Sequence, residues 1–137
     1  MAEIDFCLII SHSTRSNEGI LSTIIGLIGY IPPEYANTMK VTLASNVYNF
    51  GVVLLELLTG RPPIKDGMVL TQWVQGTPSR SENWEQILDS RITRSSFQER
   101  NCVISFLRIA LASTDSSPAA RPKMNTVVGM LQSLAQT

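Results

Sequence analysis

The stretch SNVYNFGVVLLELLTG, residues 45–60, decides how the rest of the chain is interpreted. Its apolar run is about a dozen residues long, whereas a helix that crosses a bilayer needs about 20. A long buried strand would accommodate Glu56 poorly. A helix instead has a start signal in Ser45-Asn46 and a stop signal at Gly60. We therefore predict a helix that is apolar on all sides and lies at the centre of a helical domain.

The carboxy-terminal half is expected to supply the helices that pack around this central one. Apolar residues recur at intervals of three and four residues within 97–114 and within 123–136, and the second segment is entered through Pro122. Shorter helical pieces are predicted over 68–76 and 83–89. The first 30 residues mix polar, β-branched and glycine residues without a clear period, which indicates an irregular arm. The predicted fold class is therefore mainly α.

Composition restricts the classes of function. Lys plus Arg and Asp plus Glu are both 11, so the formal net charge is zero and no electrostatic basis for binding nucleic acid exists. Cys7 and Cys102 stand far apart and His12 is the only histidine, so neither a disulfide scaffold nor a zinc site is expected. The amino terminus lacks the positive charge of a secretory signal. These features favour a cytoplasmic protein without a membrane segment.

Four segments, in order and spacing, resemble one protein family: GYIPPEY, SNVYNFGVVLLELLTGRPP, QWV and ARPKMNTVVGMLQSL. They are similar to the carboxy-terminal lobe (C-lobe) of plant leucine-rich-repeat receptor-like serine/threonine protein kinases. The resemblance is specific from 26 to 134 and weaker from 3 to 25. It implies one partial kinase domain over 1–137, with an activation-segment-like arm over 1–35 and a helical subdomain over 36–137. The family uses ATP and Mg²⁺ and is membrane-anchored, with the kinase domain on the cytosolic side of the plasma membrane.

The resemblance also implies an ion pair between the arm and the helical base. In the family a Pro-Glu pair closes the activation segment, and its Glu binds an Arg before the last helix; here these are Pro33, Glu34 and Arg121. The forked guanidinium suits a bidentate carboxylate better than a lysine would. From the residues alone, the alternative is two surface charges that never meet. Gly51 also matches the family, at a position that serves packing.

The residues that serve phosphoryl transfer are largely missing. The chain has no GxG sequence to cradle phosphates, and His12 is followed by Ser13-Thr14 rather than by the family's Arg-Asp. Asp5 lies where the family has its magnesium-binding Asp, but the Gly two residues later has become Cys7. A single carboxylate holds Mg²⁺ poorly, so we expect Asp5 to be at most a vestigial metal ligand, the alternative being a solvated acid. No cofactor is expected for this chain.

Two further features concern charge and regulation. Asn46 stands where most active relatives carry an Asp; it keeps the ability to cap a helix and lacks the charge. Hydroxyl residues in the activation-segment-like arm are candidates for phosphorylation, the alternative being a polar linker. These candidates are Ser11, Ser13, Thr14, Ser16, Ser22 and Thr23.

Together these patterns predict a truncated, degenerate kinase C-lobe that does not transfer phosphate by itself. Its expected role is that of a pseudokinase-type fragment that binds another protein. Two alternatives remain open: the chain is a piece of a longer, active, ATP-dependent receptor-like kinase, or it is a helical module that associates with itself.

Overall fold

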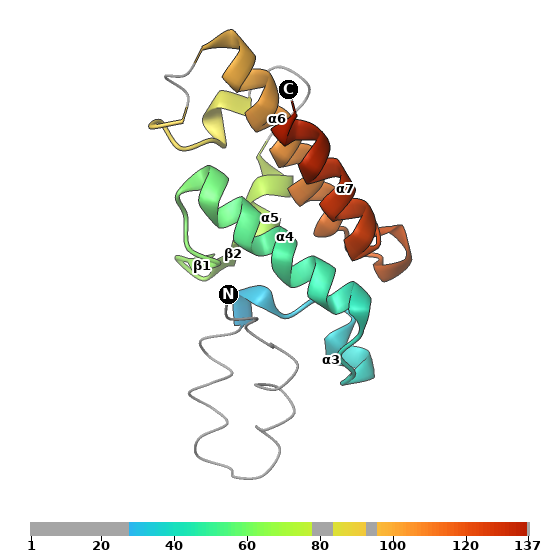
Figure 1. The fold of residues 1–137 in the computed structure, drawn as a ribbon. Coiled ribbons are helices and arrows are strands. Elements are labelled where there is room, and N and C mark those ends of the chain that lie inside the picture. Colours follow the sequence, from blue (N-terminus) through green and yellow to red (C-terminus); the bar gives the residue numbers. More distant parts are fainter. Residues whose placement is uncertain (1–27, 78–83, 93–95, 137) are drawn as a thin grey trace, which may run out of the picture.

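The computed structural model describes residues 28–77, 84–92 and 96–136. This part of the chain is mainly helical, which confirms the predicted fold class. Figure 1 shows the elements, which in chain order are η2 (Ile28–Tyr30), α3 (Tyr35–Thr38), α4 (Leu43–Thr59), β1 (Ile64–Lys65), β2 (Met68–Val69), α5 (Leu70–Gly76), η3 (Trp84–Gln86), α6 (Phe97–Ser113), η4 (Pro118–Ala120) and α7 (Met124–Ala135), where η marks a 3-10 helix.

Helix α4 is the predicted central helix, and a capping box defines its start. The Thr42 hydroxyl accepts a hydrogen bond from the Ser45 N–H at 3.2 Å, and the Ser45 hydroxyl accepts one from the Thr42 N–H at 3.1 Å. At the other end Gly60 takes a left-handed conformation with a φ of 65°, and its N–H donates to the Glu56 carbonyl at 2.9 Å. The predicted stop at Gly60 is therefore confirmed.

The predicted start signal of α4 at Ser45-Asn46 was wrong, because the helix already begins at Leu43, and the capping role of Asn46 was therefore wrong as well. The N-cap residue is Thr42, whose extended backbone directs its hydroxyl at the first turn. Asn46 is already inside the helix, where its backbone N–H donates to the Thr42 carbonyl at 3.2 Å. Asn46 is a half-buried helical residue and not a cap.

Two clusters of buried side chains hold the helices together, and α6 contributes to both. The larger cluster joins α4, α5, α6 and the segment after η3; it contains Leu55, Leu58, Leu70, Val74, Ile87, Leu107 and Ala110. The smaller cluster joins α4, α6 and α7 through Val47, Ile109 and Val127. Figure 1 shows α4 and α7 crossing in front of α6. Helices α4 and α6 therefore both contribute to the two parts of the core.

The sequence had predicted that α4 is surrounded by other helices on every side, and this prediction was wrong. Leu57 is 68% exposed among the described residues, because no described element covers that side of the helix. Where α4 meets α6, Gly51 allows a close approach. A Cβ at this position would lie 2.7 Å from Thr114 Cγ2 and 2.8 Å from Ser113 Cβ, so the two helices pack through a residue without a side chain.

The segment between α4 and α5 contains a hairpin that the sequence analysis missed. β1 pairs with β2 in antiparallel register, with Ile64 opposite Val69. Asp66 and Gly67, the two turn residues, have φ values of 53° and 76°. An Asp-Gly pair favours this tight turn, so the signal was present in the sequence. As a result α5 begins at Leu70, two residues after the start of the helix predicted over 68–76. Of the helix predicted over 83–89, the described residues 84–89 form a 3-10 helix at 84–86.

The described ranges contain no helix that is both long enough and apolar enough to cross a bilayer. Residues 1–27 of the expected irregular arm over 1–35 lie outside the described residues. The described end of the arm consists of η2 and the turn that leads into α3.

Candidate functional site

The predicted site is centred on the end of the arm, where a tight turn positions Glu34. The Tyr35 N–H donates to the Pro32 carbonyl at 3.1 Å and closes a four-residue turn. Pro33 occupies the second position of this turn, where the fixed φ of proline is favoured. Glu34 follows with φ −66° and ψ −22° and begins α3. The Pro-Glu pair therefore fixes the direction in which the Glu34 side chain leaves the backbone.

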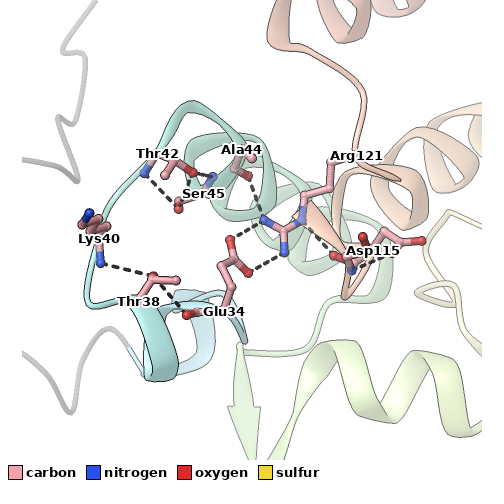
Figure 2. A network of polar contacts seen from close by, with 9 residues as sticks. Glu34, Thr38, Lys40, Thr42, Ala44, Ser45, Asp115 and Arg121 are labelled. Carbon is pink, nitrogen blue, oxygen red and sulfur yellow. Dashed lines mark hydrogen bonds and ion pairs between the residues drawn. The ribbon is translucent and has the colours of Figure 1, made fainter. Parts of the chain in front are cut away.

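Glu34 and Arg121 form a bidentate ion pair, although 87 positions separate them in the sequence. Arg121 Nη1 lies 2.7 Å from Glu34 Oε1, and Nη2 lies 2.8 Å from Oε2 (Figure 2). The Arg121 side chain is 0% exposed and that of Glu34 is 15% exposed. Arg121 comes directly before Pro122, which favours its extended backbone (φ −70°, ψ 141°). The structure thus brings the two residues together in the predicted forked geometry.

Arg121 also donates two hydrogen bonds to backbone carbonyls. Its Nε donates to the Asp115 carbonyl at 2.8 Å, and Nη1 donates to the Ala44 carbonyl at 3.0 Å. Its guanidinium carbon lies 4.9 Å from the centre of the Tyr48 ring. The Asp115 carboxylate accepts from the Ser117 N–H at 2.8 Å and so holds the loop that presents this carbonyl. One side chain therefore joins the arm, the first turn of α4 and the loop after α6.

The charges of the site follow from these contacts. Hydrogen bonds from Arg121 hold the pKa of the Glu34 carboxyl below its ordinary value. Burial raises the pKa of Tyr48, whose hydroxyl lies 3.2 Å from the Thr71 hydroxyl at the start of α5. Glu34 is therefore ionised at neutral pH and Tyr48 is neutral. The ionised Glu34 carboxylate thus faces the Arg121 guanidinium as a charged pair.

A second polar contact connects the arm to α4, and the sequence analysis did not identify it. The Tyr30 hydroxyl donates to Glu56 Oε2 at 2.5 Å, which explains why an acid is tolerated within the apolar run of α4. Burial and this hydrogen bond raise the pKa of Tyr30 to about 12. Two turns earlier on α4, the buried Asn49 side chain donates to the backbone carbonyls of Tyr30 and Ser45 when its amide nitrogen faces them. In the sequence, the only signal for this contact was the position of Tyr30 shortly before the Pro33-Glu34 pair.

A hollow of about 260 Å³ lies beside the ion pair, between the arm, α4 and α5. Its lining includes Ile28, Ile31, Pro33, Tyr48 and Thr71, and no lining residue is charged. Small-molecule sites in proteins usually occupy about 300–1,000 Å³. The hollow is therefore suited to one uncharged side chain rather than to a nucleotide.

The described residues do not offer a donor set for the Mg²⁺ that kinases use. Within 28–77, 84–92 and 96–136, no three His, Cys, Asp or Glu side chains come together. Asp5, the expected vestigial ligand, lies outside the described residues, and so do all six phosphorylation candidates, Ser11, Ser13, Thr14, Ser16, Ser22 and Thr23. The described part of the chain thus contains the structural residues of the predicted site and not its chemical ones.

Comparisons with known proteins agree with this geometry. Residues 4–131 match the family described as protein tyrosine and serine/threonine kinases. The chain is 49% identical over 120 residues to the leucine-rich repeat receptor-like tyrosine-protein kinase PXC3 of Arabidopsis thaliana. It is 39% identical over 116 residues to the leucine-rich repeat receptor-like protein kinase TDR of the same plant. These matches cover 85% and 82% of this chain but 14% and 11% of the relatives, so the chain spans a small part of their length.

A solved structure gives the same result for the fold. The pseudokinase domain of BIR2, described as an immune regulator of the RLK/Pelle family, matches with a TM-score of 0.69 and 35% sequence identity. The match covers 79% of this chain and 33% of that one. Since the family match extends over residues 4–131, and the helices and the Glu34–Arg121 tie agree with it, the chain belongs to the protein tyrosine and serine/threonine kinase family and corresponds to the helical C-lobe of a kinase domain.

Proposed function

We propose that this chain is a kinase-fold binding module: a partial kinase domain over 1–137 that engages another protein and does not itself transfer phosphate. The observation that carries the proposal is a contrast between two sets of residues. The residues that hold the C-lobe together are present and in contact, with Arg121 completely buried against Glu34. The sequences that would hold a nucleotide and activate a substrate hydroxyl, the GxG loop and the His-Arg-Asp loop, do not occur in the chain.

Two further points support the proposal. The BIR2 domain, which matches in fold, is itself described as a pseudokinase and as an immune regulator. In addition, the hollow beside the ion pair is lined by uncharged side chains and opens next to Ile28, which is 43% exposed. Such a lining suits an aliphatic or aromatic side chain of a bound protein. A cytoplasmic location follows from the proposal, because the kinase domains of receptor-like kinases function there.

Phosphotransfer is tested by incubating the purified chain with labelled ATP, Mg²⁺ and a general protein substrate. We expect incorporation at the level of a blank, with an active receptor-like kinase domain as the positive control. The variant Asp5→Asn is the matched control, since Asp5 lies at the position of the family's metal ligand. Incorporation that exceeds the blank and disappears in Asp5→Asn would refute the proposal, whereas incorporation that survives this substitution comes from a contaminating kinase.

The binding half of the proposal needs its own measurement. The chain is immobilised and exposed to the purified cytoplasmic domain of an active leucine-rich-repeat receptor-like kinase, with binding followed by interferometry. We expect saturable binding that a bulky, charged substitution in the hollow, Ile28→Glu, reduces without changing the melting temperature. Binding that Ile28→Glu leaves unchanged would place the contact elsewhere and remove the hollow from the proposal.

A second candidate rests on the length comparison. The chain spans 14% of PXC3, so it is also compatible with being a part of a longer, active, ATP-dependent receptor-like kinase. In that case the remaining kinase parts are encoded upstream in the same transcript. Sequencing full-length transcripts across the codon for Met1 separates the two candidates: an open reading frame that continues upstream into a glycine-rich loop and a His-Arg-Asp loop favours the longer kinase.

A further inference from the structure

A second groove lies at the far end of the molecule from the ion pair, between η3 and the beginning of α6. It has a volume of about 200 Å³, and its apolar lining includes Trp84, Leu88, Ile92, Val103 and Ile104. These residues come from the segment that contains η3 and from the first two turns of α6, the yellow to orange end of the molecule in Figure 1. The groove shares no residue with the kinase-family tie between Glu34 and Arg121.

The rim of this groove carries an aromatic ring that faces the solvent. Phe97, the first residue of α6, is 80% exposed, which leaves about 120–200 Å² of aromatic surface in water. An apolar cavity of about 150 Å³ is large enough to bind benzene. A groove of about 200 Å³ therefore has room for one phenyl ring. The same surface thus presents a ring and a space of matching size and polarity.

The rim of the groove also carries one acidic and one basic side chain. Glu85 and Arg100 are among the residues that line the groove, and Arg100 Nη1 lies 3.6 Å from Glu85 Oε1. Their side chains are 71% and 51% exposed, so this ion pair lies at the surface of the molecule. A two-fold interface places the same patch on both sides, and it therefore needs one acid and one base that can exchange partners.

We propose that this groove is a self-association surface whose occupant is a second copy of the chain. Phe97 of each copy enters the groove of the other, and Glu85 of one copy faces Arg100 of the other across a two-fold axis. The exposed ring supplies the apolar contact, and the two charge pairs fix the orientation. This inference is independent of the proposed loss of phosphotransfer, because it uses neither the ion pair nor the hollow beside it.

The small size of the patch sets the expected strength. Stable protein interfaces bury about 1,200–2,000 Å² in total, and one ring per copy with its rim supplies less than this. Association should therefore be weak, with a dissociation constant between about 1 μM and 1 mM. Sedimentation velocity over this range of concentrations should show a shift from monomer to dimer, and dilution should reverse it.

The first pair of variants tests the ring. Phe97→Ser should weaken dimerisation at least about tenfold, since a central aromatic contact usually dominates a small interface. The matched control is Leu43→Ser. Leu43 is 84% exposed and is also the first residue of a 17-residue helix with a capping box, but it lies on α4. Leu43→Ser should leave dimerisation unchanged, and the melting curves of both variants should match the parent curve.

The second pair tests the charges by exchange. Glu85→Arg and Arg100→Glu should each dimerise poorly alone, because like charges then face each other across the axis. Mixed in equal amounts, they should form a heterodimer at least as well as the parent chain forms its dimer. Loss of the internal Glu85–Arg100 contact is common to both variants, so recovery on mixing cannot come from folding.

Three results would overturn the proposal. The parent chain could remain monomeric up to about 1 mM, in which case the groove is left to a segment of a different protein. Dimerisation could survive Phe97→Ser, which would place the interface elsewhere. The two charge variants could fail to associate when mixed, which would remove Glu85 and Arg100 from the contact.

Discussion

Replacement of Arg121 by alanine is the most direct test of the tie between the arm and the helical base. The substitution removes four hydrogen bonds, two to Glu34 and one each to the carbonyls of Ala44 and Asp115. It also leaves the Glu34 carboxylate, only 15% exposed, without its counter-charge. Breaking a buried ion pair by removing one partner typically costs about 3–5 kcal/mol. That is a large share of the total stability of about 5–15 kcal/mol expected for a domain.

The assay is thermal unfolding followed by circular dichroism at 222 nm. For a chain of this size, 1 kcal/mol corresponds to a shift of about 4 °C, so Arg121→Ala should lower the melting temperature by about 12–20 °C. Arg121→Lys should recover only part of this loss, because an ammonium group cannot form the fork. The control is Arg91→Ala. Arg91 also pairs with a carboxylate, that of Asp89, which is 13% exposed, but the Arg91 side chain itself is 84% exposed and not buried like that of Arg121. Its loss should therefore lower the melting temperature much less than Arg121→Ala does.

The pH dependence gives a second test of the same reasoning. Arg121 lowers the pKa of Glu34 from its ordinary value of 4.5, so the pair stabilises the fold fully above that value. The stabilisation is lost as the pH falls from 4.5 through the lower pKa of the folded state. The difference in stability between the parent chain and Arg121→Ala should therefore be constant near neutral pH and should become smaller below pH 4.5. Equal melting temperatures for Arg121→Ala and Arg91→Ala at pH 7 would refute the buried tie.

Three further predictions concern the helices and the arm. Gly51→Ala should destabilise the chain by about 1–3 kcal/mol in urea unfolding, because its Cβ would lie 2.7 Å from Thr114 Cγ2. Gly129→Ala is the control: no atom lies within 4 Å of its added Cβ, so it should stabilise α7 by up to about 1 kcal/mol. Thr42→Ala should cost about 1 kcal/mol and Asn46→Ala clearly less; the reverse order would restore Asn46 as the cap. In an absorbance titration at 295 nm, Tyr30→Phe should remove the phenol whose pKa is about 12. In the parent chain, the stability that this phenol contributes is present below pH 10 and is lost as the pH rises through about 12.

Local signals in the sequence were sufficient for the helices of the C-terminal half. Apolar residues at intervals of three and four predicted α6 and α7 almost to the residue, because nothing in the tertiary structure opposes that pattern. The start of α4 was misplaced because Thr42, Ser45 and Asn46 are all good capping residues. Which one caps depends on where the chain takes the extended conformation before the helix, and a list of residue types does not reveal this.

The candidate site divides in the same way. Glu34 and Arg121 could be paired from the sequence only through the family resemblance, since periodicity says nothing about residues in different elements. The contacts of Arg121 with the Ala44 and Asp115 carbonyls had no sequence signal, because any residue can offer a backbone oxygen. The proposed self-association surface around Phe97 also had no signal in the sequence. An apolar residue at the start of a helix is ordinary in a sequence, and only its exposure next to a groove makes it informative.

The tie at Arg121 also has a consequence for the rate at which the chain unfolds. Glu34 and Arg121 stand 87 positions apart, and closing so long a loop has an entropic cost, which favours late formation of their contact during folding. A contact that forms after the transition state contributes little to the rate of folding and much to the barrier against unfolding. If the ion pair forms after the transition state, we expect Arg121→Ala to speed unfolding much more than it slows folding, and stopped-flow measurements of both rates test this.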